Sequence, residues 1–292
     1  MPKLTIGLAI FLLIIGNFAG VISDAFIKEV PGDASVLQFI FFRQITAVLL
    51  LAPFCFLHRS QPFFGQLKWH FVRAHIWLIG AICMVLSLSA LPLATVNALF
   101  YTSPIIMLIL MMFFSSDTVK RSSLLVVILG FVGVLIIVKP SQFNWAAVMA
   151  LIVAVSMALN NLLIKKLPTH HSVFQTLFLT SLMGIPSSLL LALGEGSKWD
   201  FSSLWLAAAS NIFILCYAGI CVWVYRAINP SKVAGAEYTG LLGAIIVGSL
   251  WFNETPEMSM YYGAALIILP LIWVAKADRK TAKLATKLKE TT

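Results

Sequence analysis

A stretch of sequence recurs in the second half of the chain, and this repeat limits the possible folds more than any other feature. Residues 27–41 reappear at 164–178 with seven identities among fifteen positions. The identities are Ile27, Lys28, Pro31, Ser35, Val36, Gln38 and Phe41, which align with Ile164, Lys165, Pro168, Ser172, Val173, Gln175 and Phe178. The same offset, which we call the repeat offset, aligns Ala90 with Ala227, Val96 with Val233, and Tyr101-Thr102 with Tyr238-Thr239. Each half of the chain is therefore one unit used twice.

The composition places both units in lipid. Hydrophobic residues make up 60% of the 292 residues and charged residues 11%, with a mean hydropathy of +0.97, whereas soluble domains carry roughly 25% charged residues. Ten continuous apolar runs each approach the roughly 17–25 residues that a helix needs to cross a bilayer. They lie at about 4–25, 35–57, 74–91, 94–115, 122–138, 144–164, 172–193, 202–225, 232–252 and 258–275. Because the runs do not alternate with polar residues, helices are favoured over a barrel and the fold class is all-α.

The cations orient the chain in the membrane. If the N-terminus is cytoplasmic, sixteen cations fall on the inner side and three, Lys28, Lys139 and Lys198, on the outer side. The inner set is Lys3, Arg59, Lys68, Arg73, Lys120, Arg121, Lys165, Lys166, Arg226, Lys232, Lys276, Arg279, Lys280, Lys283, Lys287 and Lys289. The positive-inside rule then predicts a multi-pass protein of the bacterial inner membrane with both termini in the cytoplasm. The net charge of +9 follows from this topology, and no nucleic-acid partner is needed to explain it.

Five spans per unit is an odd number, so the second unit must enter the bilayer from the opposite side. The aligned charges agree, because Lys28 falls outside and Lys165 inside, while Asp117 falls inside and Glu254 outside. We expect two inverted-topology repeats, 1–140 with spans 1–5 and 141–276 with spans 6–10, followed by a basic cytoplasmic tail at 277–292. Repeated halves of this kind are typical of a transporter with its substrate site between them.

Motifs along most of the chain, roughly residues 4–275, resemble the drug/metabolite transporter superfamily in its ten-helix EamA-type branch. The resemblance is carried by Ser23-Asp24-Ala25 with Lys28, Phe41-Phe42-Arg43, Leu91-Pro92 to Pro104, Gly130, Gly133, Lys139-Pro140, Ala236 to Thr239, and Asn253-Glu254. It implies a central cavity lined mainly by spans 1, 3, 4, 6, 8 and 9, and alternating access without ATP. The aspartate of span 1 and the Phe-Phe-Arg of span 2 resemble carriers of S-adenosylmethionine and riboflavin; exporters of aromatic amino acids belong to the wider family. The sequence departs from the family at Asp117, where glutamate is common, and lacks the small multidrug relatives' mid-membrane glutamate in span 1.

Charged side chains within spans are costly in lipid, which makes each one a functional candidate. Arg43 lies in span 2, Asp24 near the outer end of span 1, and Glu237 in span 9. Glu237 aligns with Phe100 in the first unit, so the scaffold does not require a charge there. We expect Glu237 and Asp24 to be proton-coupling candidates. An internal ion pair for Arg43 and a helix-end polar contact for Asp24 are the alternatives.

Aromatic and amide side chains near the middle of the spans form a second group of candidates. Phenols and rings can hold a flat or amphipathic solute through stacking and hydrogen bonds. The predicted substrate-binding residues are Tyr101, Tyr238, Asn97, Phe100, Glu237, Asn160, Trp223 and Arg43. The alternatives are membrane-interface belts for the aromatic residues and helix-to-helix hydrogen bonds for the asparagines.

Helix-breaking residues accompany these candidates in both units. Pro104 follows Tyr101 in span 4, and Gly240 and Gly243 occupy the equivalent place in span 9. Interruptions in corresponding spans indicate a binding site or a hinge. We therefore expect hinges at these three residues.

Other functional classes find less support. The sequence contains no HExxH, GxSxG or Walker motif, no spacing of cysteines and histidines suited to a metal, and no ring of charges suited to a channel. We predict no enzyme activity, no cofactor and no metal. The expected function is secondary transport of a small neutral or zwitterionic organic metabolite, such as a riboflavin-like vitamin, S-adenosylmethionine or an aromatic amino acid. A channel or a membrane-embedded enzyme is the alternative function. Among carriers, export is favoured over import, and protons are candidate coupling ions. We expect a monomer or a homodimer.

Overall fold

The computed structural model describes residues 4–57, 60, 62–114, 121–138, 145–228, 232–255, 257–266, 268–270 and 273. The described residues form helices and their connections, with no strand among them. The α-helices are α1 (Ile6–Lys28), α2 (Val36–Leu57), α3 (Leu67–Ala90), α4 (Leu93–Phe100), α5 (Ser103–Phe114), α6 (Arg121–Val138), α7 (Trp145–Leu163), α8 (Val173–Gly194), α9 (Leu204–Ala227) and α10 (Thr239–Phe252). Two 3₁₀ helices, η2 (Ile164–Lys166) and η4 (Ala234–Tyr238), and a last apolar helix, Met258–Pro270, complete the set.

The helices match the ten expected spans. Within the described residues, seven helical stretches are long and apolar enough to cross a membrane, and two shorter apolar helices follow at Ala236–Phe252 and Met258–Pro270. Span 4 consists of α4 and α5, and span 9 of η4 and α10. The predicted all-α membrane fold is confirmed. Asp117, Lys139-Pro140, the unit boundary near residue 140 and the tail at 277–292 lie outside the described residues.

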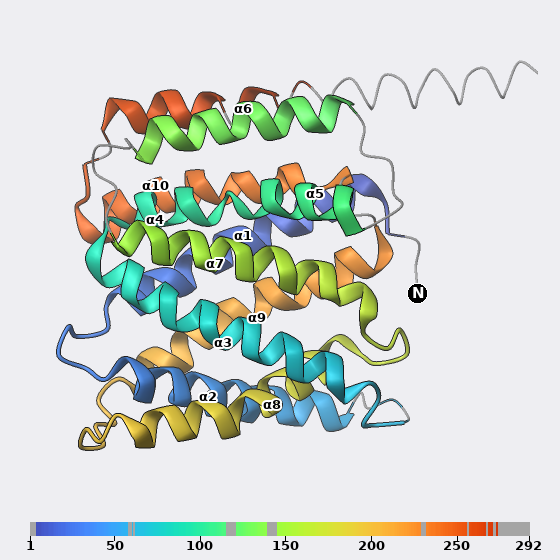
Figure 1. The fold of residues 1–292 in the computed structure, drawn as a ribbon, viewed down its shortest axis with the longest axis vertical. Helices are drawn as coiled ribbons and strands as arrows, with labels where there is room; N and C mark the ends of the chain where they lie inside the picture. Colours follow the sequence, from blue (N-terminus) through green and yellow to red (C-terminus); the bar gives the residue numbers. More distant parts are fainter. Residues whose placement is uncertain are drawn as a thin grey trace, which may run out of the picture.

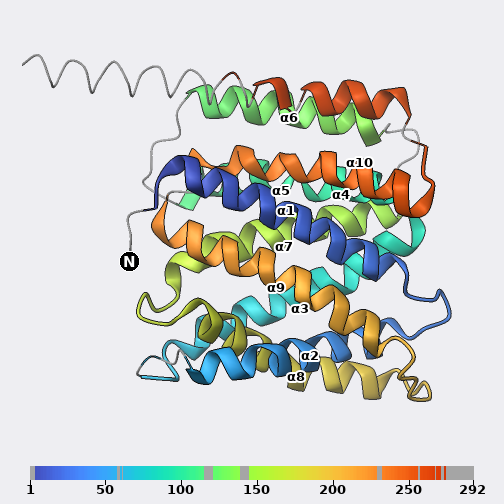
Figure 2. The ribbon, with the colours of Figure 1, turned by 180° about the vertical axis from the view of Figure 1, so that it is seen from behind.

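The packing of the helices follows the two-fold relation between the units. The repeat offset converts α1, α2 and α3 into α7, α8 and α9, and α4–α5 into η4–α10. Helix α1 contacts α9, and the equivalent helices, α7 and α3, also contact each other. In the same way, α1 contacts α10, and α7 contacts α4 and α5. Helices that the two-fold relation converts into each other also lie against each other, namely α2 against α8 and α4 of span 4 against α10 of span 9 (Figures 1 and 2). This exchange of partners is what inverted repeats around a pseudo-two-fold axis produce.

Two glutamines show the same relation in their hydrogen bonds. Gln38 Nε2 donates to Ser197 Oγ at 2.9 Å and to Lys198 O at 3.0 Å, and its Oε1 accepts from Asp200 N at 3.0 Å. Gln175, the equivalent of Gln38, donates to Ser60 O at 3.2 Å and to Phe63 O at 3.0 Å, and accepts from Ser60 N at 2.8 Å.

Each glutamine therefore clasps the connection between the second and third helices of the other unit. Ser60 and Ser197 are themselves equivalent under the repeat offset. The two clasped connections, α2–α3 and α8–α9, lie at opposite ends of the bundle (Figure 1). The units are thus inverted relative to each other.

Spans 4 and 9 are both interrupted at the aligned tyrosines. Helix α4 ends at Phe100, Tyr101 and Thr102 form a turn, and α5 starts at Ser103 with Pro104 as its second residue. In span 9 the 3₁₀ helix η4 ends at Tyr238 and α10 starts at Thr239. Because proline lacks an N–H and disfavours a helical residue before it, Pro104 accounts locally for the first break. The breaks place backbone and side-chain polar groups at membrane depth.

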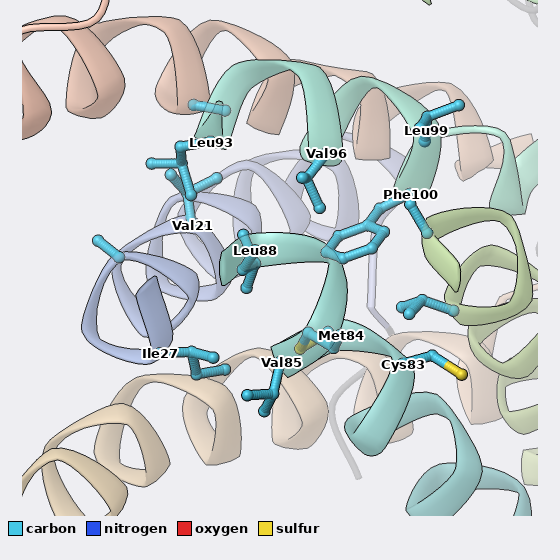
Figure 3. Close-up of a cluster of buried hydrophobic side chains, with 14 of the residues drawn as sticks. Val21, Ile27, Cys83, Met84, Val85, Leu88, Leu93, Val96, Leu99 and Phe100 are labelled. Atoms are coloured by element: carbon cyan, nitrogen blue, oxygen red, sulfur yellow. The ribbon is translucent and has the colours of Figure 1, made fainter. Parts of the chain in front are cut away.

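Apolar packing holds the broken span 4 against its neighbours. Val21 of α1, Met84 and Leu88 of α3, and Val96 and Phe100 of α4 are all buried in one cluster. Figure 3 shows these side chains converging between the three helices. Large apolar residues that face outward, such as Leu49, Leu190 and Leu250, are well exposed, as expected for a surface in contact with lipid tails. Burial of polar side chains inside the bundle is therefore the informative signal.

Candidate functional site

A polar cavity of about 80 Å³ lies between α2, α3, α7, α8 and α9. We name it the arginine cavity because two arginines, Arg43 of α2 and Arg73 of α3, line it. Its other lining residues include Gln44, Trp77, Asn160, Asn161, Thr180, Ser181, Asn211, Tyr217 and Cys221. The wall thus combines two cations, several amides and hydroxyls, and two aromatic rings. Such a mixture suits an organic solute that carries polar groups.

A second cavity of about 30 Å³ adjoins the first and carries the opposite charge. We name it the aspartate cavity after Asp24 of α1. Its lining residues are Asn17, Gly20, Asp24, Trp77, Met84, Asn97, Phe100, Tyr101, Met157, Ile214 and Tyr217. Four of these residues, Trp77, Met157, Ile214 and Tyr217, also line the arginine cavity. The two cavities therefore form neighbouring compartments of one polar interior, cationic at one end and anionic at the other.

Asp24 and Arg43 act on each other electrostatically across this interior. Both side chains are buried, and they do not form a direct ion pair. The Asn97 side chain contacts the Asp24 carboxyl and also donates from Nδ2 to Leu93 O at 3.2 Å. Two opposite charges that are not paired directly can each contact one end of a dipolar group.

Asn211 of α9 supports the arginine cavity from the second unit. Its Nδ2 donates to Arg43 O and to Thr46 Oγ1, both at 2.6 Å. These bonds tie α9 to α2 at the turn that carries Arg43. The Nε of Arg43 has no hydrogen-bond partner among the described residues.

Glu237 lies directly behind the wall of the arginine cavity. It is buried in η4, where it accepts hydrogen bonds from the Tyr225 hydroxyl and from Asn161 Nδ2, the latter at 3.5 Å. Asn161 itself lines the cavity. In the part of the chain that the structure describes, the hydrogen-bond partners of Glu237 are neutral. A carboxyl in this setting can carry or release a proton without breaking an ion pair.

The break in span 9 is tied to α1 through Asn17. Asn17 Nδ2 donates to Ala236 O at 2.9 Å and to Thr239 Oγ1 at 3.4 Å. Asn17 is also a lining residue of the aspartate cavity. The interrupted backbone that carries Glu237 is therefore linked to the cavity by a direct hydrogen bond.

The structure brings most of the predicted substrate-binding residues to this interior. Arg43 and Asn160 line the arginine cavity, Asn97, Phe100 and Tyr101 line the aspartate cavity, and Glu237 backs the wall. Asn160 also donates from Nδ2 to Ser156 O at 3.0 Å, an intrahelical bond.

Tyr238 and Trp223 lie elsewhere. The Tyr238 hydroxyl packs against Gly130 of α6, 3.2 Å from the position that a β-carbon would take there. Trp223 lines a lateral apolar groove of about 510 Å³ between α2, α8 and α9. Tyr101 and Tyr238 therefore do not share one pocket, although the repeat relates them. The reason is that their broken spans contact different neighbours, α10 for Tyr101 and α6 for Tyr238.

The predicted hinge residues lie at close backbone approaches. A β-carbon on Gly240 would collide with the Tyr101 hydroxyl, and one on Gly243 would lie 3.2 Å from the Phe18 ring. Glycine is therefore required at residue 240 for span 9 to approach Tyr101.

Arg73 is the main residue that the sequence analysis did not find. The charge count assigned it to a cytoplasmic loop because the apolar run starts at residue 74. The structure begins α3 at Leu67, so Arg73 lies inside the helix and is 6% exposed. Trp77 and Tyr217, which separate the two cavities, were also not predicted. The spacing of Arg73, Trp77 and Ala81 along one helical face could have indicated the cavity.

Histidines gather near the end of the bundle where α3 starts. His70 Nδ1 lies 3.0 Å from Thr180 Oγ1, and the His70 ring stacks on that of His171 at 5.8 Å. Burial lowers the pKa of His171, so its imidazole is neutral at pH 7. No group of three or more metal-ligating side chains occurs within the described ranges.

A bundle of repeated membrane-spanning helices around a polar interior defines a transporter. The chain belongs to the EamA-like transporter family, whose sequence profile matches residues 7–139 and 144–275. The resemblance predicted from the sequence is therefore confirmed. Membership of this family makes the protein a multi-pass membrane transporter of small metabolites.

Curated relatives carry several substrate names. The chain is 23% identical to an S-adenosylmethionine uptake transporter of Rickettsia prowazekii over 271 residues, which covers 89% of this chain and 90% of the relative. It is 26% identical to a riboflavin transporter of Vibrio cholerae over 222 residues, 75% and 74% of the two chains. It is 21% identical to a pseudopaline exporter of Pseudomonas aeruginosa over 285 residues, 92% and 96% of the two chains.

A solved crystal structure shares the fold. It superposes with a TM-score of 0.69 at 13% sequence identity and covers 94% of this chain and 97% of its own length. At this identity the likeness extends to the arrangement of the helices alone.

Proposed function

We propose that the protein is a secondary carrier that moves a small zwitterionic or neutral organic metabolite across the bacterial inner membrane by alternating access. The observation that carries this proposal is the polar interior with Arg43 at one end and Asp24 at the other. An α-amino acid group presents a carboxylate and an ammonium, which fit these two charges. The rings of Trp77 and Tyr217 lie between the two compartments and suit a flat group,.

S-adenosylmethionine is the first candidate on our shortlist. It combines a zwitterionic α-amino acid group and a flat adenine ring with a sulfonium that adds one positive charge, and it is the substrate named for a relative aligned over nine-tenths of its length. Riboflavin and aromatic amino acids follow. Riboflavin is supported by the name of another relative, and aromatic amino acids are supported by the rings and charges of the cavity.

The proposed cycle requires the interior to widen. The cavities hold about 80 and about 30 Å³, whereas sites for drug-sized ligands typically hold roughly 300–1,000 Å³. We infer that the structure is a closed state and that the two units separate to admit the solute. The breaks at Tyr101 and Tyr238, with Pro104, Gly240 and Gly243 beside them, are the proposed hinges. In the closed state we assign no direct solute contact to Tyr238 or Trp223.

Glu237 and Asp24 are the proposed proton-coupling groups. Both are buried carboxyls at membrane depth, and Glu237 accepts only from neutral donors among the described residues.

We also propose that both termini are cytoplasmic, as the distribution of cations predicts. Relatives are named for uptake and for export, and of the two directions we propose export.

Counterflow in liposomes tests the proposed function. The purified chain is reconstituted with an internal pool of unlabelled solute, and uptake of labelled S-adenosylmethionine, riboflavin or tryptophan is followed. A carrier concentrates label transiently against the pool, and we expect this for one of the three solutes. Protein-free vesicles are the control. Absence of counterflow for all three, in vesicles shown to contain folded protein, would contradict the proposed solute class, and equal flux with and without the pool would indicate a channel.

A further inference from the structure

Arg73 is a buried cation without a counter-charge among the described residues. It lies six residues beyond the first residue of α3, which is about 9 Å along the helix axis. The side chain is 6% exposed and lines the arginine cavity. Its Nε and Nη1 atoms have no hydrogen-bond partner within the described chain. A guanidinium left in this state is costly within a membrane.

The neighbours of Arg73 do not supply the missing charge. The ionisable groups that interact with it electrostatically are Arg226 and Cys221, and His70 also lies close. Arg226 is already bonded, because it donates to Thr176 Oγ1 at 2.6 Å and to His171 O at 2.7 Å. His171 is neutral at pH 7 and therefore carries no charge that could balance Arg73. The field around Arg73 is therefore positive.

Two other cations of the described chain differ from Arg73 in this respect. Arg43, which is buried, interacts with Asp24, and Lys28, which is only partly buried, forms an ion pair with Glu254 at 3.3 Å. The second unit has no cation at the equivalent place, because the repeat offset aligns Arg73 with Ser210. Ser210 is fully buried and donates to Ala207 O at 3.2 Å. The scaffold therefore does not require a cation at this place.

We propose that Arg73 forms an anion subsite of the cavity together with Arg43, where the two guanidinium groups bind the carboxylate of the transported solute. The guanidinium fork matches a carboxylate with two parallel hydrogen bonds. Arg73 lines the same cavity as Arg43 but interacts electrostatically with Arg226 and not with Asp24, so it adds a second guanidinium to the carboxylate contact that the proposed function gives to Arg43. The inference deepens the proposed function, on which it rests for the identity of the solute.

A first experiment tests the subsite without any assumption about the solute. The melting temperature of the purified full chain is measured with acetate and with chloride at matched ionic strength. A ligand of the folded state raises the melting temperature, so acetate should stabilise the wild type clearly more than Arg73→Gln. Lys68→Gln, an exposed charge removal on the same helix, is the matched control and should respond like the wild type.

The outcomes of this experiment are distinct. Equal responses of the wild type and Arg73→Gln to acetate would overturn the subsite. An equal rise with chloride would show that the site takes inorganic anions and would overturn the carboxylate assignment. Without added anion, Arg73→Gln should melt at or above the wild-type temperature, because the change removes an unpaired buried charge. A clearly lower melting temperature would mean that the protein itself supplies a partner for Arg73, which also contradicts the proposal.

A second experiment uses two solutes that differ only in the carboxylate. Binding of S-adenosylmethionine is compared with that of its decarboxylated form in the wild type, Arg73→Gln and Arg73→Lys. We expect the wild type to prefer the carboxylated form about tenfold or more, Arg73→Gln to lose most of this preference because only Arg43 remains, and Arg73→Lys to retain more of it. A loss of affinity that is equal for both forms would identify Arg73 as structural and overturn the proposal.

The two proposals fail in different ways. Specific stabilisation by acetate without binding of S-adenosylmethionine would retain the subsite and reject the first candidate solute. Counterflow of S-adenosylmethionine with an unchanged carboxylate preference in Arg73→Gln would retain the carrier and reject the subsite.

Discussion

The Lys28 ammonium lies 3.3 Å from the Glu254 carboxylate and joins the end of α1 to the end of span 9. Both side chains also hold the turn between α3 and α4. Lys28 donates to Leu91 O at 2.6 Å, and Glu254 accepts from Leu93 N at 2.9 and 3.0 Å. A carboxylate at the N-terminus of α4 is further favoured by the helix dipole. The pair therefore connects the two units one helical turn from Asp24 and Asn97, which line the aspartate cavity.

Loss of this connection should open that end of the protein. In Glu254→Gln the ion pair is broken, and we expect a cysteine placed at Asn97 to react faster with a water-soluble thiol reagent. The free energy of unfolding should fall by about 1 kcal/mol, since a partly exposed, charge-assisted contact is lost. Asp33→Asn, an exposed carboxyl change on the same side, should leave the rate unchanged. An unaltered rate in Glu254→Gln would show that the pair does not close the cavity.

Glu237 should couple transport to protons. Because its described hydrogen-bond partners are the neutral groups Tyr225 and Asn161, a permanently neutral glutamine can replace it without leaving an unpaired charge. Glu237→Gln should keep solute counterflow and lose transport driven by a pH gradient, with a flat dependence of rate on pH. The control is Tyr225→Phe, which removes a donor but keeps the carboxyl and should retain a pH dependence. Full gradient-driven transport in Glu237→Gln would exclude this role.

Gly240 should be essential because its α-carbon faces the Tyr101 hydroxyl. Gly240→Ala forces the phenol aside, and overpacking of this kind costs about 1–3 kcal/mol. We expect counterflow to fall about tenfold or more while the protein still inserts and folds. Gly7→Ala is the matched control, because a β-carbon there meets nothing within 4 Å. Similar counterflow in both variants would contradict the assigned packing of span 9 against Tyr101.

Gln38 and Gln175 should contribute equally to stability, since each clasps the corresponding connection of the opposite unit. Each side chain is buried and forms several hydrogen bonds. Replacement by alanine leaves backbone groups unsatisfied, at a cost of about 1–3 kcal/mol. Thermal unfolding of Gln38→Ala and Gln175→Ala should show similar losses. A large loss in one variant alone would mean that the inverted repeats are not energetically equivalent at this clasp.

Apolar runs and the internal repeat were sufficient to predict the ten spans and the inverted arrangement of the two units. The alignment of residues 27–41 with 164–178 fixes which helices correspond, and apolar runs fix where they lie. The same reasoning placed Asp24, Arg43 and Asn97 in the interior, because a polar group in an apolar run has few other places to go. The interruptions at Tyr101 and Tyr238 were likewise visible from the nearby proline and glycines.

The placement of the other site residues depends on where each helix begins and on its orientation about its own axis. Arg73 precedes the apolar run, so its burial follows only from the start of α3 at Leu67. Tyr238 and Trp223 have the composition of cavity residues, yet their helices turn them toward α6 and toward the lateral groove. Hydropathy records the depth of a residue in the bilayer and not the direction of its side chain.

The central claim is that the solute binds between Arg43 and Asp24 in a carrier. The most direct test is counterflow of labelled S-adenosylmethionine in liposomes that contain the wild type, Arg43→Gln or Asp24→Asn at equal amounts of folded protein. We predict saturable counterflow by the wild type and rates at least about tenfold lower in both variants, because each loses one charge contact with the α-amino acid group. Wild-type counterflow in both variants would contradict the account.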